Sequence, residues 1–301
     1  MTLNRRTFLA SGVASAALAS PLAAAAPKLG VNFGGFHRVT LGDFEITTLA
    51  GGTRVVEEPQ KIFGLNVSAD DFAAASSMAN IPADRTRFYF TPVLVNTGSE
   101  LVLFDAGLNG QATLAQIEAA GYTADQIDKV IITHMHGDHI GGLMGDAGET
   151  FAGAEYVSGA AENNFWAGQD NKNYKAKVMP LAEKFSFVSD GASVASGITA
   201  MDASGHTPGH MAYMLESNGA SMLLGADFAN HYVWSLGYPD WEVRFDMDKS
   251  GAAARRRQIL DMLATDKIPF TGYHMPFPAI GYVSTRGDGF EYEPATYQLT
   301  L

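Results

Sequence analysis

The sequence contains no cysteine among its 301 residues. This absence excludes disulfide bonds, cysteine nucleophiles and thiolate ligands for a metal ion. A metal site in this chain must therefore use nitrogen and oxygen donors from histidine, aspartate and glutamate.

Basic residues are also scarce. Charged residues make up 17% of the chain, and 20 Lys and Arg residues face 32 Asp and Glu residues, so the net charge is −12. Such a surface repels phosphate backbones, which argues against a nucleic-acid partner. A hydrophobic fraction of 47% in a chain of this length is sufficient for a large buried core.

Long hydrophobic runs and nucleotide-binding motifs are missing as well. Beyond the N-terminal segment, no apolar run approaches the roughly 20 residues that a membrane span requires, so we expect no such span. No Gly-x-Gly-x-x-Gly or phosphate-loop motif occurs.

The N-terminal segment has the pattern of a twin-arginine-type signal peptide. Arg5 and Arg6 precede a small, apolar run over residues 10–22, which ends in four alanines at 23–26. This order of features is typical of exported proteins, although an alanine-rich first helix is the alternative. We expect residues 1–26 to be removed and residues 27–301 to form a single domain, periplasmic or secreted.

Hydrophobic patterns predict alternating strands and helices in both halves of the chain. The strands are expected at 42–49, 53–56, 93–95, 101–104, 129–132, 155–157, 185–188, 198–201, 212–215 and 222–224, and the helices at 111–120, 160–168, 174–183 and 248–263. The first two strands are separated by two glycines and predict a hairpin. The whole pattern favours an α/β fold in which two packed sheets lie between outer helices, an αββα four-layer sandwich.

Two other segments carry weaker signals. Residues 59–81 show poor helical periodicity and predict a flap or loop without a readable role. Arg255, Arg256 and Arg257 lie in the last predicted helix. In so acidic a chain they predict a solvated helix face with local salt bridges.

Five of the eight histidines are candidate metal ligands, and these five lie in three short contexts. His134, His136 and His139 belong to one His-x-His-x-Asp-His segment after a predicted strand, and His206 and His274 lie in two later segments. Residues two apart at a strand end share one side, and the turn that follows can bring Asp138 and His139 to a neighbouring point. Imidazoles and carboxylates suit zinc, manganese, iron or cobalt, so one segment can serve two metal ions.

The order of the motifs resembles that of the metallo-β-lactamase superfamily. The His-x-His-x-Asp-His segment is followed by Gly-His-Thr-Pro-Gly-His at 205–210, by an aspartate after an apolar strand and by a late histidine. The resemblance implies the metallo-β-lactamase fold and two divalent ions, zinc first, with manganese, cobalt or iron as alternatives. It assigns His134, His136 and His206 to the first ion, Asp138, His139 and His274 to the second, and Asp227 as the bridging carboxylate.

Two further residues match supporting positions of that family. Asp105, in an Asp-Ala-Gly segment, resembles the carboxylate that orients the ligand segment from behind. His210 is the second histidine of the later motif and is expected to stabilise its loop rather than to bind metal.

The resemblance narrows to methyl parathion hydrolases and their lactonase relatives, over about residues 38 to 292. It rests on the segments 41–47, 94–99, 132–136 and 277–281. Those enzymes are exported and cleave phosphotriesters, aryl esters or lactones at a dinuclear site. This chain departs from them at Gly137, where they usually have proline, and in the short polar loop 108–110.

We therefore expect an exported dinuclear metal-dependent hydrolase of esters or lactones, with aryl esters and organophosphate triesters as further substrates. A hydroxide shared by the two ions would attack the substrate, with Asp138 and Asp227 as the catalytic carboxylates. The substrate is expected to be neutral or mildly apolar because the chain is acidic. The expected pocket walls are Phe90, Phe165, Trp166, Tyr174 and Trp234.

Several alternatives share the ligand pattern. A metallo-β-lactamase generally lacks the bridging aspartate, and a glyoxalase II-type thioester hydrolase is normally cytosolic. An iron-dependent sulfur dioxygenase, a flavodiiron reductase and a non-catalytic binding module are the candidates from other classes. Relatives often form homodimers, and the sequence leaves the oligomeric state open.

Overall fold

The computed structural model describes residues 34–295 and 297–301. The expected signal peptide, residues 1–26, lies outside the described residues. No helix among the described residues is both long and apolar enough to cross a membrane.

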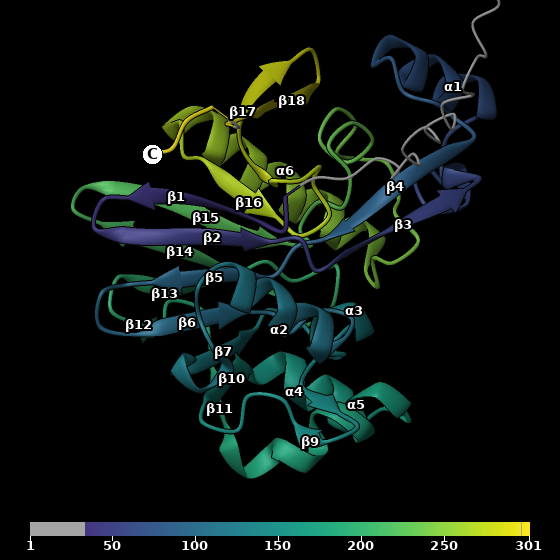
Figure 1. Ribbon diagram of the computed structural model, residues 1–301. Helices are drawn as coiled ribbons and strands as arrows, with labels where there is room; N and C mark the ends of the chain where they lie inside the picture. Colours follow the sequence, from purple (N-terminus) through teal and green to yellow (C-terminus); the bar gives the residue numbers. More distant parts are fainter. Residues whose placement is uncertain (1–33, 296) are drawn as a thin grey trace, which may run out of the picture. The chain divides into compact units, whose positions relative to one another are not determined.

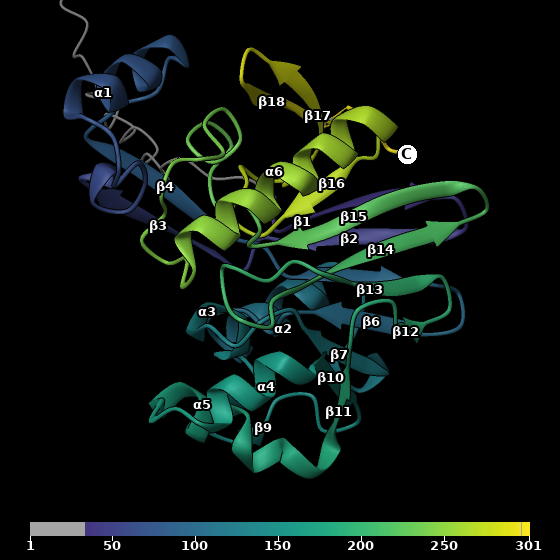
Figure 2. The ribbon, with the colours of Figure 1, turned by 180° about the vertical axis from the view of Figure 1, so that it is seen from behind.

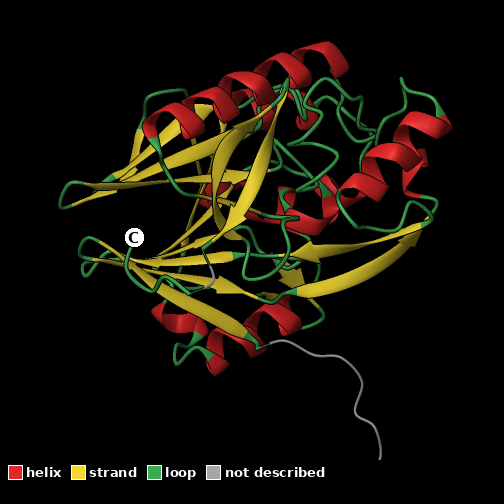
Figure 3. Cartoon of the chain, turned by 90° about the horizontal axis from the view of Figure 1, so that it is seen from above, coloured by secondary structure: helices red, strands yellow, loops and turns green. Residues whose placement is uncertain are grey.

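Two seven-stranded sheets face each other across the central core (Figures 1 and 3). Ile46 and Ile131 of the first sheet pack with Tyr213 and Leu224 of the second, and all four side chains are buried. The first sheet has the order β1 (Phe36–Leu41), β2 (Phe44–Leu49), β5 (Val93–Asn96), β6 (Leu101–Phe104), β7 (Lys129–Ile132), β10 (Glu155–Gly159) and β11 (Phe185–Val188). The second has the order β12 (Ser193–Ala195), β13 (Ile198–Asp202), β14 (Met211–Ser217), β15 (Ala220–Ala226), β16 (Phe270–Gly272), β17 (Ile280–Arg286) and β18 (Gly289–Pro294).

Helices cover the outer faces of both sheets (Figure 2). Ile117 and Trp166 pack with apolar residues of the first sheet, and Leu260 packs with apolar residues of the second. The two sheets and their helices confirm the predicted four-layer αββα fold. The helices are α2 (Gly110–Ala119), α3 (Gly137–Ile140), α4 (Ala160–Ala167), α5 (Lys172–Lys177) and α6 (Lys249–Asp266), with 3-10 turns η2 (Ala124–Gln126) and η3 (Met179–Lys184) and a small hairpin of β8 (Met144–Gly145) and β9 (Gly148–Glu149).

One predicted helix is divided in two. The helix expected at 174–183 consists of α5 followed by η3. Pro180 stands near the start of η3. Because proline has no amide hydrogen and its ring clashes with the preceding turn, an α-helix cannot run through this position undisturbed.

The predicted hairpin between residues 42–49 and 53–56 is wrong. Strand β3 (Gly52–Glu57) pairs with β4 (Arg85–Phe90), whereas β2 pairs with β1 and β5. Most side chains of β3 are partly or fully exposed. The continuous apolar run of β5 is the better fit beside the buried strand β2, so β3 and β4 form a separate two-stranded ribbon.

Residues 59–81 contain more structure than the sequence pattern indicated. They form η1 (Pro59–Lys61) and α1 (Ala69–Met78), and the side chain of Ser68 accepts a hydrogen bond from the Asp71 amide at the start of α1. Phe63 and Phe72 of this segment pack with Phe88 and Trp234 in a separate aromatic cluster. The segment therefore supports the ribbon of β3 and β4 from one side.

The three consecutive arginines of α6 have different environments. Arg255 and Arg257 make surface ion pairs with Asp202 and Asp240, as the sequence suggested. Arg256 is buried and forms an ion pair of 2.6 Å with the buried Asp246, so the expectation of a solvated side chain is wrong for this residue. Neighbouring residues of a helix lie about 100° apart, so one of three consecutive arginines can face the core while its neighbours face solvent.

Replacing Arg256 with Met should lower the free energy of unfolding by about 3 to 5 kcal/mol, because Asp246 would remain as a buried charge without its partner. Arg255→Met and Arg257→Met are the matched controls and should each cost about 1 kcal/mol or less. Urea denaturation of the three variants measures the difference. Equal, small losses in all three would contradict the role assigned to Arg256.

His231 is a buried neutral histidine in the loop between β15 and α6. Its Nδ1 accepts hydrogen bonds from the backbone amides of Val233 and Trp234, at 3.1 and 3.2 Å. The proton must then lie on Nε2, which is 3.2 Å from Thr86 Oγ1 on β4 and can donate to it. Burial lowers the pKa of His231 from 6.5 to about 3.

This lowered pKa predicts a dependence of stability on pH. Between pH 6.5 and about 3, the unfolded chain binds a proton at His231 and the folded chain does not, so acid favours unfolding. Between pH 7.5 and 5.0, wild type should lose about 2 kcal/mol more unfolding free energy than His231→Gln, as measured by urea denaturation. The same loss in both proteins would show that His231 is not held neutral.

Candidate metal centre

Five of the seven candidate ligands lie in loops that follow or connect strands of both sheets, and Asp138 and His139 lie in the short helix α3. His134 and His136 follow β7 of the first sheet. Asp227 directly follows β15 of the second sheet, His274 follows β16, and His206 lies between β13 and β14. Packing the two sheets face to face therefore brings together residues that are up to 140 positions apart in the sequence.

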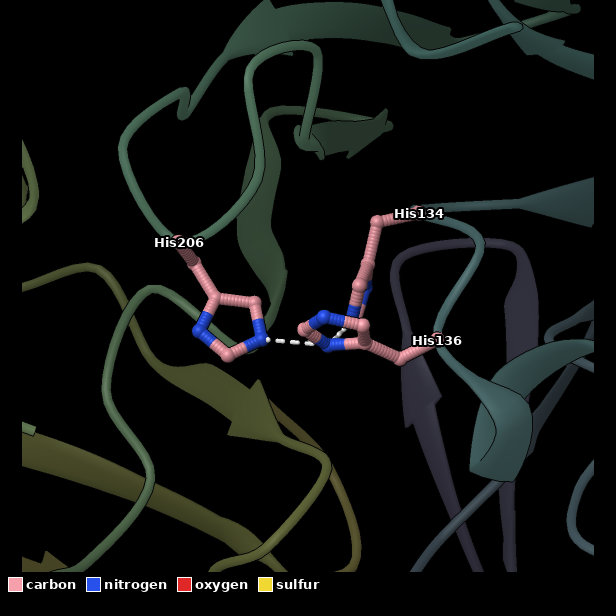
Figure 4. Close-up of side chains that lie close together, drawn as sticks. All are labelled: His134, His136 and His206. Atoms are coloured by element: carbon pink, nitrogen blue, oxygen red, sulfur yellow. Dashed lines mark hydrogen bonds between the residues drawn. The ribbon is translucent and has the colours of Figure 1, made fainter. Parts of the chain in front are cut away.

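His134, His136 and His206 form the first cluster (Figure 4). The Nδ1 atom of His136 lies 3.0 Å from Nε2 of His134 and 3.0 Å from Nε2 of His206. Three imidazole nitrogens on a tetrahedral zinc ion are about 3.3 Å apart, so the observed spacing is close to that of a ligand set. These are the three residues that the resemblance assigned to the first ion.

Two rings of the first cluster, those of His134 and His136, are electrostatically unsuited to binding protons. Burial and the neighbouring imidazoles lower the pKa of His136 to about 2, and burial and His139 hold the pKa of His134 well below its usual range. Both rings are therefore neutral at physiological pH. Neutral imidazoles with converging lone pairs are what a transition-metal ion requires.

Asp138, His139 and His274 form the second cluster. Nε2 of His274 and Nε2 of His139 lie 3.4 and 3.7 Å from Oδ2 of Asp138. Asp227 lies between the clusters: its Oδ2 is 3.4 Å from His206 Nε2, and its Oδ1 is 3.4 Å from His139 Nε2. All seven residues predicted as ligands are thus brought together, with Asp227 in the position expected of a bridge.

Unpartnered polar atoms test whether this donor set suits metal ions. His139 Nε2 and Asp227 Oδ1 are buried and make no hydrogen bond. Burial opposes protonation of His274, yet the Asp227 and Asp138 carboxylates raise its pKa above the usual value. The second cluster therefore attracts positive charge, and its imidazole and carboxylate donors, together with the imidazoles of the first cluster, fit two divalent cations.

Hydrogen bonds from outside the clusters orient the histidine rings. Asp105 accepts a bond of 2.7 Å from Nδ1 of His139, and Asp246 accepts one of 2.9 Å from Nδ1 of His206. The carbonyl oxygen of Tyr89 accepts one of 2.7 Å from Nδ1 of His274. With the proton held on Nδ1, the Nε2 lone pair of each ring points into the site.

Asp105 and His210 have the supporting contacts that the sequence suggested. Asp105 also accepts hydrogen bonds from the backbone and hydroxyl of Thr133, directly before the ligand segment. His210 donates from Nδ1 to the carbonyl of Ala203 and accepts from the Asp227 amide through Nε2, at 2.9 and 3.2 Å. His210 thus holds the loop beside Asp227 and belongs to neither cluster.

Sequence reasoning missed two buried acids that support the site, Asp246 and Glu162. The Glu162 carboxylate on α4 accepts bonds from the Met135 amide at 2.8 Å and from the Thr207 hydroxyl at 2.7 Å. It thereby joins the segment of His134 and His136 to the loop of His206. Both acids lie far from the ligands in the sequence and carry no motif, so only the fold reveals them.

A cavity of about 620 Å³ opens onto both clusters. Its apolar lining is formed by Val56, Ile62, Phe88, Phe90, Leu108 and Phe245. Phe90, one of the predicted walls, lines this cavity. The ribbon of β3 and β4 provides much of this lining, although the sequence pattern did not predict its pairing.

The other four predicted walls do not line this cavity. Trp166 is buried behind His136 and donates to Glu162, and Tyr174 is buried on α5 and donates to Asn163. Trp234 is buried among the phenylalanines of the separate aromatic cluster, where it donates to Ser76. Phe165 borders a different hollow beside α6. Each of the three buried side chains has a polar atom satisfied inside the protein, as buried aromatic residues require.

The chain resembles solved structures over most of its length. AidC, a dizinc quorum-quenching lactonase solved with a bound product, is 25% identical, with a TM-score of 0.78 over 86% of this chain and 97% of AidC. The hydrolase AbOPH of the beta-lactamase superfamily is 23% identical, with a TM-score of 0.78 over 88% of this chain and 98% of its own. A probable metal-dependent hydrolase from Staphylococcus aureus is 21% identical, with a TM-score of 0.72 over 85% and 99% of the two chains.

Matches to curated proteins are much shorter. Ribonuclease Z of Pyrococcus furiosus is 47% identical over 51 residues, which are 17% of this chain and 16% of the relative. The match thus spans about a sixth of that protein. The model of the metallo-beta-lactamase superfamily, in contrast, matches residues 91–269, which include six of the seven candidate ligands. The fold and the converging ligand clusters agree with this match. The chain therefore belongs to the metallo-beta-lactamase superfamily.

Proposed function

We propose that the protein is an exported, dinuclear metal-dependent hydrolase of esters and lactones. The observation that carries the proposal is the convergence of a three-histidine cluster, a second cluster of histidines and a carboxylate, and Asp227 at one cavity. The likeness to AidC, a dizinc lactonase, supports zinc as the metal and a lactone as one substrate.

The chain's own residues have separate tasks in this reaction. Two bound divalent ions would supply Lewis-acid activation of water and of the substrate's carbonyl oxygen. The Asp138 side chain is 23% exposed and lines the cavity, so its carboxylate can orient water and hold a proton. Asp227, only 3% exposed, is placed to hold the two halves of the site together. The phenol of Tyr273 donates to the Asp138 carbonyl at 2.6 Å and fixes the backbone of α3 at this residue.

The cavity supports a small substrate with apolar parts. Phe88, Phe90 and Leu108 exclude water around an acyl chain or an aryl group, which favours lactones and aryl esters. Organophosphate triesters are the further candidates, because the same donors can polarise a phosphoryl oxygen. The net charge of −12 supports a small molecule over RNA as the substrate. The proposal that the protein is exported rests on Arg5 and Arg6 and on the apolar run that follows them.

Metal analysis of the purified protein, combined with hydrolysis assays, tests the proposal. We expect about two metal ions per chain and turnover of dihydrocoumarin or p-nitrophenyl acetate, with methyl paraoxon and nitrocefin as comparison substrates. Chelation should abolish turnover, and zinc should restore it. A single iron, or a metal-loaded protein that hydrolyses none of the four compounds, would move the protein to the redox or binding class.

Replacing Asp227 with Asn should lower hydrolysis by roughly 100-fold or more and leave close to one metal ion per chain, because a neutral amide is a poor bridge between two cations. Asp43→Asn, an exposed acid away from the site, is the control and should keep both metal ions and activity. Mass spectrometry of the metal content and ester hydrolysis are measured on the same samples. Two metal ions and full activity in Asp227→Asn would refute the bridging role.

A further inference from the structure

Two arginines border the cavity above the candidate metal centre. Arg54 is on β3 of the ribbon, and Arg244 is in the loop between β15 and α6. Both side chains are exposed, and neither guanidinium donates to an acid or any other group in the part of the chain that the structure describes. By contrast, Arg255, Arg256 and Arg257 each have an aspartate partner.

The position of Arg54 follows from strand geometry. Residues two apart in a strand share a face, so Arg54 and Val56 lie on one side of β3. Arg54 is directly opposite Phe88 in the pairing of β3 with β4. Phe88 and Phe90 also line the cavity, so one face of the ribbon presents a cation among apolar walls.

Arg244 reaches the same cavity from a different element. Its backbone amide donates to the carbonyl of Ile62 at 2.7 Å, which holds the loop against the segment that supports the ribbon. Its guanidinium lies 5.9 Å from the ring centre of Phe245, another wall residue. The two cations therefore belong to two elements that border one space.

This arrangement has a chemical consequence for the substrate. A guanidinium beside apolar walls in a concave site attracts a carboxylate more strongly than one on an open surface, and it can bind both carboxylate oxygens. The net charge of the chain acts against anions only at long range, and salt screens it beyond about 10 Å. At contact distance the two arginines would favour an anionic group, in contrast to the neutral substrate expected from the composition.

We propose that Arg54 and Arg244 form an anion subsite for a carboxylate on the part of the substrate remote from the bond that is hydrolysed. The inference rests on the proposed ester and lactone hydrolysis and adds its substrate class: esters or lactones that carry a carboxylate beyond an apolar spacer. Val56, Phe88 and Phe245 would contact the spacer.

A matched pair of esters tests the subsite. Mono-p-nitrophenyl adipate and p-nitrophenyl hexanoate have acyl chains of the same length and differ in a terminal carboxylate or methyl group. The measured quantity is the ratio of kcat/KM for the adipate to that for the hexanoate. Arg54→Gln and Arg244→Gln should each lower this ratio roughly tenfold, and the double variant by more, because each removes a charge-assisted hydrogen bond.

The control is Arg85→Gln, an exposed arginine of the same ribbon that does not line the cavity. Its ratio should equal that of wild type. Raising the salt concentration from 0.05 to 0.5 M should lower the wild-type ratio and leave that of the double variant nearly constant. An unchanged ratio in the double variant would overturn the subsite, even if both esters are hydrolysed.

Failure of the proposed function gives a different result. If the metal-loaded wild type hydrolyses neither ester, the hydrolase assignment fails, and calorimetric titration with adipate then tests the subsite by itself. Binding by wild type and Arg85→Gln that is lost in the double variant supports the anion subsite. Equal binding by all three proteins, or binding by none, rejects it.

Discussion

The site depends on one electrostatic constraint: several buried rings and carboxylates direct their metal-binding atoms toward the same point. The rings cannot turn away, because Asp105, Asp246 and the Tyr89 carbonyl each hold an Nδ1 proton from behind. An uncompensated arrangement of this kind would be costly to bury. The fold therefore favours the binding of cations at the place where the two sheets meet.

The rest of the structure can be understood as support for that preference. Glu162 joins two ligand loops, and Arg256 neutralises the acid that orients His206. These contacts use charged side chains in the interior, where each needs a partner to be tolerated. The supporting residues are thus as dependent on exact placement as the ligands themselves.

Much of this could be predicted from the sequence. Most strands of the sandwich appear as apolar runs, and all seven candidate ligands lie in segments whose residue types and order are specific enough to identify them. The failures have physical causes. The pairing of β3 with β4 depends on which strand better fits beside β2, and the burial of Arg256 depends on a partner ten residues away. Trp234 is a large aromatic residue of the kind that often lines an apolar pocket, but its neighbours in space are buried aromatic residues of the core.

The ribbon of β3 and β4 has a consequence for how such an enzyme changes over time. It provides much of the cavity's wall, yet it provides none of the seven candidate ligands and has its own apolar support from α1 and Trp234. Substitutions of its cavity-facing side chains can therefore alter the shape and charge presented to a substrate, as long as the backbone carbonyl of Tyr89 keeps its hydrogen bond to His274. The side chains of the ribbon can thus change to accept new substrates while the seven candidate ligands stay the same. This separation is a structural basis for evolvability.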